Sequence, residues 1–291
     1  MVSRPPRASK VTFVPAADAP LNVFLTGCAS GIGRDLADAL VAAGHRIWAT
    51  DVAIERLREH ARAWPSDRSA CAPLDVRDAA AWESSYAAAI ERLGAIDVHV
   101  NVAGYLRPGW LRSLPLNELD RHIDVNLRGV AYGTAVAARH MSERRRGHII
   151  NVASLAGIAP IPGIAIYSAT KHAVRGLSLA AAAELREFGV AVTTICPDAV
   201  ETPMLELQVD HEEAALTFSG ARPLTTAQVV AAILRALDSR KLEVAMPRRR
   251  ALVARLAGLF PMSMQLLRGR LARRGAHRQA ERRARRRASE G

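Results

Sequence analysis

Short apolar runs alternate with segments of helical periodicity along most of the chain. The apolar runs predict buried strands at residues 21–26, 45–50, 71–74, 96–101, 148–152, 190–196 and 242–245. Between them, apolar residues recurring every three or four positions predict helices at 31–44, 54–63, 78–93, 116–141 (with an interruption), 166–188 and 225–237. This alternation predicts a doubly wound α/β fold, a three-layer sandwich around a seven-stranded parallel sheet.

The same pattern divides the 291 residues into three parts. Residues 1–19 are polar and Pro-rich, which predicts a flexible N-terminal segment and argues against a secretion signal. Residues 20–247 predict one large α/β domain, with a mobile lid at about 198–224. Residues 248–291 form an Arg-rich amphipathic C-terminal tail.

The net charge of +12 is confined to that tail. Fourteen arginines and two acids after residue 247 account for the whole surplus, so the domain itself is neutral. We therefore expect no specific nucleic-acid partner. The three cysteines are odd in number and lack metal-ligand spacing, which favours a reducing, cytoplasmic setting without a metal site.

A glycine-rich turn joins the first strand to the first helix in Thr26-Gly-Cys-Ala-Ser-Gly-Ile-Gly33. Glycine accepts positive φ and lets the backbone approach a pyrophosphate closely. The helix that begins at about Ile32 directs its free N–H groups and its dipole at such an anion. The turn therefore predicts a dinucleotide site, although its spacing differs from the common Gly-x-Gly-x-x-Gly pattern.

Asp51 ends the second strand, eighteen residues after Gly33. A carboxylate there can accept hydrogen bonds from the adenosine ribose hydroxyls and would repel a 2′-phosphate. This favours NAD(H) over NADP(H). Arg34, beside the turn, keeps NADP(H) open as the alternative because an arginine can pair with that phosphate.

Tyr167 and Lys171 lie four residues apart at the start of a predicted helix and so share one face. A nearby ammonium is expected to lower the phenol pKa from its reference of about 10, making Tyr167 a general acid/base. Ser154 follows the fifth predicted strand and is suited to hydrogen-bond a substrate oxygen. We interpret these three residues as a proton-transfer site.

Taken together, these motifs resemble the single-domain short-chain dehydrogenases/reductases over roughly residues 20–246. The resemblance implies a Rossmann-like fold and assigns Asn126, in Asp-Val-Asn-Leu, to the catalytic set with Ser154, Tyr167 and Lys171. It implies that Asn126 positions a water for proton relay and that Lys171 also holds the nicotinamide ribose. All four catalytic positions of the family pattern are present.

The resemblance also implies a cofactor site. Asp75 and Val76 correspond to the adenine contact, Asn101-Val-Ala-Gly104 to the family's Asn-Asn-Ala-Gly segment, and Thr202 to the carboxamide contact. Val102 and Asp198 depart from the family pattern, the latter replacing the glycine after Pro197. The predicted cofactor-binding set is Gly27, Ser30, Gly31, Ile32, Gly33, Asp51, Asp75, Val76, Asn101, Ala103, Gly104, Tyr167, Lys171, Pro197, Val200 and Thr202.

The segment between Ser154 and Tyr167 carries no charge and is expected to border the substrate cleft with Tyr105, Leu106 and Trp110. An apolar wall favours a hydrophobic secondary alcohol or ketone of steroid, retinoid or long-chain type. Filling of the core or of a subunit contact is the alternative explanation for these residues. Arg107 and Arg112 stay open as anchors for a charged substrate.

The C-terminal tail allows two interpretations. Pro261 is expected to break it into two short amphipathic pieces, which would suit peripheral contact with an anionic membrane. Alternatively, its apolar residues pack on the domain and only residues 273–287 are solvated or bind nucleic acid nonspecifically. The family resemblance further implies a homodimer or homotetramer through the long helices.

The sequence therefore predicts an NAD(H)-dependent oxidoreductase interconverting a secondary alcohol and a ketone. Two alternatives stay open at this point. One is an NADPH-preferring carbonyl reductase, and the other is a dinucleotide-sensing regulatory protein that binds a partner through the basic tail. The complete catalytic set argues against the sensor, which has no need of proton-transfer residues.

Overall fold

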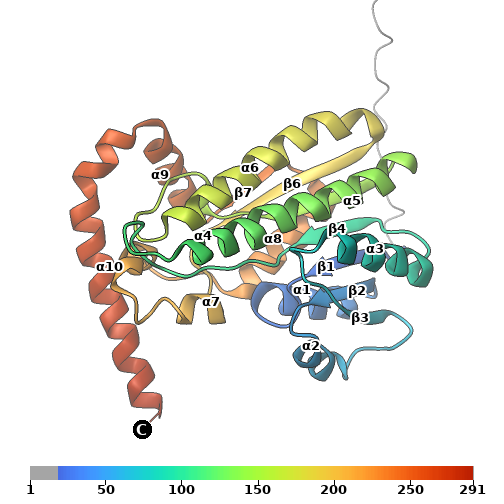
Figure 1. The fold of residues 1–291 in the computed structure, drawn as a ribbon, viewed down its shortest axis with the longest axis horizontal. Helices are drawn as coiled ribbons and strands as arrows, with labels where there is room; N and C mark the ends of the chain where they lie inside the picture. Colours follow the sequence, from blue (N-terminus) through green and yellow to red (C-terminus); the bar gives the residue numbers. More distant parts are fainter. Residues whose placement is uncertain (1–18, 291) are drawn as a thin grey trace, which may run out of the picture.

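Seven parallel strands form the centre of the computed structural model, which describes residues 19–290 (Figure 1). The predicted N-terminal segment over residues 1–19 thus falls, apart from its last residue, outside the described residues. The strands pair in the order β3-β2-β1-β4-β5-β6-β7. They are β1 (Asn22–Thr26), β2 (Arg46–Asp51), β3 (Ser69–Pro73), β4 (Val98–Asn101), β5 (Gly147–Val152), β6 (Val190–Pro197) and β7 (Glu243–Met246). The predicted doubly wound parallel sheet is confirmed.

Helices cover both faces of the sheet, as the buried strand pattern requires. On one face, α1 (Gly31–Ala42), α2 (Ile54–Ala61) and α8 (Thr226–Ser239) bury Leu36, Leu57 and Ile233 against the strands. On the other, α3 (Ala79–Leu93), α5 (Gly129–Glu143) and α6 (Ala165–Leu185) bury Trp82, Val136 and Ala181. A short 3₁₀ turn, η3 (Arg186–Phe188), extends α6 before Gly189.

The predicted interruption within residues 116–141 is a π-helical turn. The chain passes from α4 (Leu116–Ile123) through η1 (Asp124–Arg128) directly into α5. Such π turns are rare and recur at functional sites because they rotate one residue out of the regular helical path. Here the turn carries Asn126.

The strand order reverses at β1, whose two neighbours are β2 and β4. In open α/β sheets, ligands bind in the crevice beyond the carboxyl ends of the strands at this reversal. The glycine turn after β1, the loop after β4 and the loop after β5 with its 3₁₀ turn η2 (Leu155–Gly157) all lie at that edge. The topology therefore places the sequence motifs around one crevice.

The predicted lid contains two short helices, α7 (Pro203–Glu206) and the 3₁₀ helix η4 (Glu212–Ser219). A β-bridge between Val200 and Leu224 ties its ends together. The Glu201 amide donates to the Leu224 carbonyl at 2.8 Å, and the Leu224 amide to the Ala199 carbonyl at 2.8 Å. The lid is thus a loop closed at its base.

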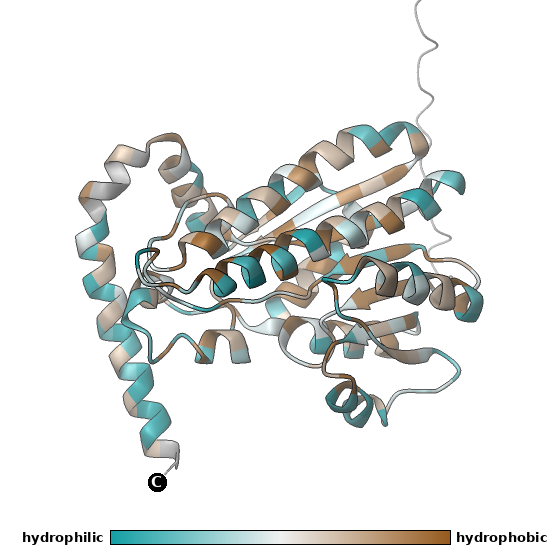
Figure 2. Cartoon of the chain, in the orientation of Figure 1, coloured by the Kyte–Doolittle hydropathy of each residue, from teal (hydrophilic) through white to brown (hydrophobic). Residues whose placement is uncertain are grey.

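The tail forms α9 (Arg248–Leu259) and α10 (Pro261–Glu290), with the expected break at Pro261. The second piece is not short, however, because its Arg- and Ala-rich sequence continues as helix for 30 residues. Figure 2 shows α10 becoming hydrophilic toward its C-terminal end. We refer to α9 and α10 together as the C-terminal arm.

Two expectations for this arm are wrong. Residues 273–287 are not simply solvated, since Gln279 is 3% exposed and Arg282 pairs with acids of the lid. The large apolar residues of α9 do not pack on the domain either. Instead Ala251, Ala254 and Ala257 are buried, because small side chains let the helix approach the loop after β5, where Gly258 faces the Ile158 carbonyl.

Candidate active site

The glycine turn after β1 packs too closely for any other residue at two positions. Gly27 has φ +74°, and a Cβ there would lie 2.8 Å from the Ala103 nitrogen. A Cβ on Gly33 would lie 2.0 Å from the Gly27 carbonyl oxygen. Only glycine fits at these two positions, and the turn they form leads into the N-terminus of α1, where free N–H groups suit a dinucleotide pyrophosphate.

Thr26 joins this turn to the loop after β4. Its Oγ1 accepts hydrogen bonds from the amides of Val102 and Ala103 at 3.0 and 3.1 Å. Asn101, before that loop, is buried and donates through Nδ2 to Asn151 Oδ1 at 2.9 Å. Asn101 therefore holds β4 against β5, while Ala103 and Gly104 form the floor beside the turn.

Ser30 and Ile32 flank Gly31, which has φ +55°. Ser30 is the N-cap of α1 in extended conformation, and no cap hydrogen bond involving its side chain is found among the described residues. The Thr202 Cγ2 atom would lie 3.1 Å from a Cβ on Gly31, so the segment after β6 closes over the turn. The start of α1 thus fits an anionic group.

Asp51 ends β2 beside the same turn. Its Oδ2 accepts from the Ala29 amide at 2.9 Å and its Oδ1 from the Ala53 amide at 2.8 Å. Each oxygen keeps a further lone pair for a ribose hydroxyl. Arg34 is paired with Asp35, Nη2 to Oδ1 at 3.1 Å.

Asp75 and Val76 follow β3. Arg77 donates to both carboxylate oxygens of Asp75 and holds its pKa below the ordinary value. The Val76 carbonyl accepts from the indole of Trp82 at 2.9 Å. These bonds fix the Asp75-Val76 turn beside the crevice, but they also engage the carboxylate that the resemblance assigns to adenine.

Tyr167 and Lys171 share one face of α6, as the four-residue spacing predicts. The Lys171 Nζ lies 5.6 Å from the centre of the Tyr167 ring and donates to the Val152 carbonyl at 2.9 Å. Ser154 caps the turn η2: its Oγ accepts from the Ala156 amide at 3.1 Å. The Ser154 hydroxyl also lies close enough to the phenol to lower its pKa.

Burial decides the protonation of this pair. It raises the pKa of Tyr167 to about 12, against the opposing effect of the Ser154 hydrogen bond. It also lowers the pKa of Lys171 to about 8. The expected lowering of the phenol pKa by Lys171 does not occur here, because desolvation raises that pKa and the Lys171 ammonium donates to Val152. The phenol is protonated at neutral pH.

Asn126 projects from the π turn toward the same place. Its Oδ1 accepts from the Tyr105 amide at 2.7 Å and its Nδ2 donates to the Tyr105 carbonyl at 2.8 Å. A Cβ on Gly104 would lie 3.5 Å from Asn126 Oδ1 and 3.8 Å from Lys171 Nζ. The structure thus brings Gly104, Asn126 and Lys171 together from three separate elements.

The segment after β6 completes the site. The Pro197 carbonyl accepts from the Ser154 hydroxyl at 3.4 Å, and Thr202 Oγ1 donates to the Val200 carbonyl at 3.1 Å. Asp198, which departs from the family pattern, pairs with Arg250 of α9 at 2.8 Å. The departure therefore has a structural reason, since the side chain anchors the C-terminal arm.

The expected substrate side is apolar. Leu106, Ala156, Ile164 and Tyr167 form a buried cluster, with Ile161 and Met204 packed against it. A cavity of about 380 Å³ beside the lid is lined in part by Trp110, Pro162 and Leu216. Arg107 is not available as a substrate anchor, because it pairs with Glu118 at 2.9 Å. Arg112 lies over the Trp110 ring.

Sequence reasoning missed the contacts that three residues make at this site. Thr26 stands inside the glycine motif and so carried a signal, but its bonds reach across to the loop after β4. Val152 contributes only its carbonyl, to which any residue type is equivalent. The backbone of Tyr105 holds Asn126, and its hydroxyl donates to Glu118 at 2.6 Å.

The other kinds of site considered, metal centres, membrane spans and histidine sites, have little structural support. Among residues 19–290, no group of three or more His, Cys, Asp or Glu side chains is arranged to hold a metal ion. No helix in this range is both long and apolar enough to cross a membrane. His122 and His172 bond backbone carbonyls of their own helices, and His140 accepts from the Ile96 amide.

Comparison with known proteins agrees with this geometry. The family model described as short chain dehydrogenase matches residues 21–213. The chain is 34% identical over 196 residues to a 2-(R)-hydroxypropyl-CoM dehydrogenase of Xanthobacter autotrophicus, covering 65% of this chain and 78% of the relative. It is 37% identical over 183 residues to a 3-alpha-(or 20-beta)-hydroxysteroid dehydrogenase of Mycobacterium bovis, covering 63% and 70%.

A solved structure of a short-chain dehydrogenase from Streptomyces avermitilis superposes with a TM-score of 0.75 at 28% identity, covering 88% of this chain and 99% of that one. Levodione reductase superposes with a TM-score of 0.73 at 28% identity, covering 80% and 98%. With the family model matching most of the chain, the protein belongs to the short-chain dehydrogenase family and is an NAD(P)-binding oxidoreductase of alcohol or ketone substrates.

Proposed function

We propose that this enzyme interconverts a hydrophobic secondary alcohol and its ketone with NAD(H). The observation that carries the proposal is the meeting of Ser154, Tyr167, Lys171 and Asn126 beside the glycine turn. Proton transfer needs a hydroxyl with a partner that orients it and a route for its proton. These four side chains supply that arrangement at the edge of the sheet where a dinucleotide fits.

Each side chain has a role in the proposal. The nicotinamide, when bound, exchanges hydride with the substrate carbon. Tyr167 gives a proton to the substrate oxygen or takes one from it, and Ser154 orients that oxygen. Lys171 holds the ribose of the cofactor and, with Asn126, forms the start of a proton path. A phenol whose pKa is raised by burial keeps its proton at neutral pH and can give it to a ketone oxygen.

The preference for NAD(H) is supported by charge. Asp51 retains acceptor capacity at the end of β2 and would repel a 2′-phosphate. Arg34, the residue that left NADP(H) open, is engaged by Asp35. The nearby charges therefore favour a cofactor with free ribose hydroxyls.

A steroid, retinoid or long-chain compound is the proposed substrate class. The buried cluster around Tyr167 provides apolar surface, and Trp110 and Pro162 line part of the neighbouring cavity together with charged side chains of the lid and of α10. Apolar pockets with a few placed polar groups are the usual form of small-molecule sites. The hydroxysteroid dehydrogenase among the relatives agrees with this class.

The test is a panel of apolar secondary alcohols and ketones, with turnover followed by NADH absorbance. At least one compound is expected to react, and Tyr167→Phe should reduce turnover by about 10²–10⁴-fold while NADH binding persists. Tyr132→Phe, a tyrosine on α5, is the matched control. Inactivity toward the whole panel, or full turnover in Tyr167→Phe, would refute the proposal.

Two partners are also proposed. Family resemblance supports a homodimer or homotetramer through the long helices, including α6, which sedimentation velocity measures directly. The second partner is an anionic membrane surface at the junction of α9 and α10. Large apolar side chains are exposed there, with Leu259 at 72% and Leu266 at 85%. The exposed set is Leu252, Val253, Leu256, Leu259, Phe260, Met262 and Leu266.

Charge favours a membrane as the occupant of that surface. Arg248, Arg249, Arg268 and Arg270 are exposed in the same stretch, and residues 244–280 contain no Asp or Glu. Apolar side chains flanked by arginine suit the boundary of an anionic bilayer. A lipophilic substrate would be concentrated in the same place.

A further inference from the structure

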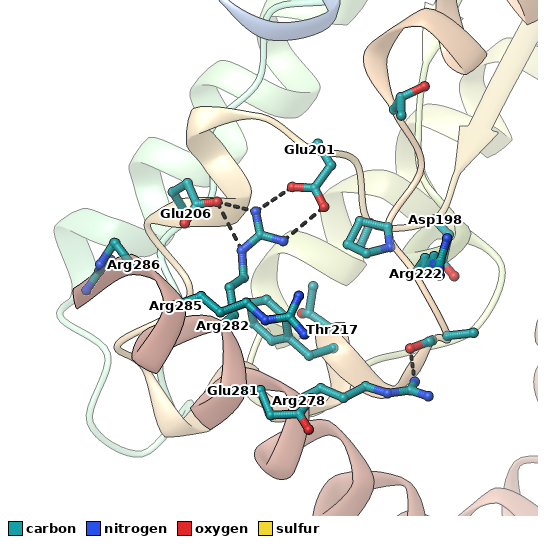
Figure 3. Close-up of a pocket in the computed structure, with 16 residues that line it drawn as sticks. Asp198, Glu201, Glu206, Thr217, Arg222, Arg278, Glu281, Arg282, Arg285 and Arg286 are labelled. Carbon is teal, nitrogen blue, oxygen red and sulfur yellow. Dashed lines mark hydrogen bonds and ion pairs between the residues drawn. The ribbon is translucent and has the colours of Figure 1, made fainter. Parts of the chain in front are cut away.

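The C-terminal arm forms ion pairs with both ends of the segment 198–206. At the first end, Arg250 of α9 donates to Asp198 Oδ2 at 2.8 Å. At the other end, Arg282 of α10 lies between Glu201 and Glu206 and bonds both (Figure 3). Its Nη1 meets Glu201 Oε1 at 2.9 Å and its Nε meets Glu206 Oε1 at 3.0 Å. We call this second contact the Arg282 clamp.

The opposite side of the segment faces the active site. Thr202 packs against Gly31 of the glycine turn. Met204 packs against the buried cluster that contains Leu106 and Tyr167. Residues 201–206 therefore lie between the Arg282 clamp on one side and the cofactor turn and catalytic tyrosine on the other.

The rest of the lid is also bonded to α10. Gln279, which is buried, donates to the carbonyls of Gln208 and His211 at 2.8 and 2.6 Å. Arg278 donates to the Ser219 carbonyl at 3.1 Å, at the C-terminal end of η4. A Cβ on Gly275 would lie 1.8 Å from the Ala215 carbonyl oxygen, so only glycine permits this close packing of helix on lid.

The lid has little core of its own to replace these contacts. Its own cluster of buried apolar residues is Leu205, Val209, Ala214 and Phe218, with Ala199 packed against them, while Val200 and Leu224 at its base join the main core. A cluster this small stabilises a loop weakly, so the position of the lid depends on the helix it lies against. Because α10 supplies that helix, the arm decides where the lid sits.

Arginine is the residue type that the clamp requires. A guanidinium presents its N–H groups in a planar fork and can bond two carboxylates at once, whereas lysine is a point charge. Arg282 is 24% exposed, and Glu201 and Glu206 are 40% and 44% exposed. The hydrogen bond with Glu201 holds the pKa of Arg282 above its ordinary value.

We propose that Arg282 is a positioning residue for the substrate cleft, holding residues 201–206 so that Thr202 and Met204 close over the cofactor turn and Tyr167. This inference rests on the proposed function, since it concerns how that alcohol or ketone is held. Tyr167 and Lys171 stand on α6, which contributes no residue to the Arg282 clamp. Loss of the clamp should therefore weaken substrate binding and leave the chemical step intact.

The experiment compares Arg282→Gln with Arg285→Gln in the full chain. Arg285 lines the same cavity of about 940 Å³ on α10 but is not part of the clamp (Figure 3). Arg282→Gln should raise the KM for the best alcohol about tenfold, with kcat changed less than about twofold. Arg282→Lys should recover only part of the difference, and Arg285→Gln should match the parent.

Hydrogen exchange supplies a readout that needs no activity. Amides of residues 203–219 should exchange faster in Arg282→Gln than in Arg285→Gln, while those of α6 stay unchanged. Glu206→Gln, a milder change, should move KM and exchange in the same direction. Unchanged protection of the lid, or a fall in kcat without a rise in KM, would overturn the inference. If the parent is inactive toward every compound of the panel, the proposed function is refuted. The hydrogen-exchange comparison would still decide whether Arg282 positions the lid.

Discussion

The Lys171 ammonium donates a hydrogen bond to the Val152 carbonyl at 2.9 Å, joining α6 to the last residue of β5. Lys171 is 3% exposed, and burial lowers its pKa to about 8. The carbonyl offsets only part of the cost of removing an ammonium from water. The fold therefore holds a poorly solvated amine beside Tyr167, where a cofactor ribose would give it further partners.

The first prediction concerns the pH dependence of this amine. The pKa of Lys171 is about 8 in the folded chain against an ordinary value of 10.5, so the unfolded chain binds more protons between these values. Stability from this group is therefore lowest below pH 8 and rises as pH increases toward 10.5. Relative to Lys171→Met, the parent should gain about 2–3 kcal/mol across this window in urea unfolding.

The matched control for that measurement is Lys241→Met, an exposed lysine. It should follow the parent at every pH. Lys171→Met should also lose turnover. A constant stability difference between the parent and Lys171→Met from pH 7.5 to 10 would contradict the assigned pKa.

A second prediction tests the glycine turn. Gly33→Ala places a Cβ 2.0 Å from the Gly27 carbonyl oxygen, so the turn must shift. We expect a loss of about 1–3 kcal/mol in stability and at least tenfold weaker NADH binding by fluorescence titration. Gly176→Ala on α6 meets no described atom within 4 Å and should instead stabilise by about 0.5–1 kcal/mol. Parent-like NADH binding in Gly33→Ala would remove the turn from the cofactor site.

A third prediction tests cofactor choice at Asp51. Asp51→Asn preserves the shape of the side chain but removes the charge that would repel a 2′-phosphate. The ratio of NADPH to NADH dissociation constants should fall by about tenfold or more. Asp67→Asn, a surface aspartate that is 77% exposed, serves as the control. If Asp51→Asn leaves the ratio as it is in the parent, the preference has another origin.

A fourth prediction concerns the apolar surface at the α9–α10 junction. The parent should co-sediment with vesicles containing anionic lipid, and Leu259→Glu should weaken this by about tenfold, since burying a leucine is worth about 1.5–3 kcal/mol. Leu116→Glu, on α4 and 76% exposed in the parent, is the control. Equal sedimentation of parent and Leu259→Glu would end the membrane proposal. A parent that forms a dimer, does not bind vesicles and becomes monomeric in Leu259→Glu would also end the membrane proposal.

The sequence by itself determined the alternation of strands and helices, the glycine turn after β1 and the shared face of Tyr167 and Lys171. These features depend on short-range periodicity and on spacings within a single turn or helix, which local residue types encode. The interruption that carries Asn126 was also visible as a break in one long helical pattern.

Only the tertiary structure decided what these residues touch. Asn126 bonds the backbone of Tyr105 across 21 residues, and burial reverses the pKa shift expected for Tyr167. The tail shows the limit most clearly: its arginines suggested a solvated end, yet Arg282 lies between two acids 76 and 81 residues earlier in the chain. Which face of a helix packs, and against which charges, depends on the surface it meets, and that surface is assembled from distant segments only when the chain folds.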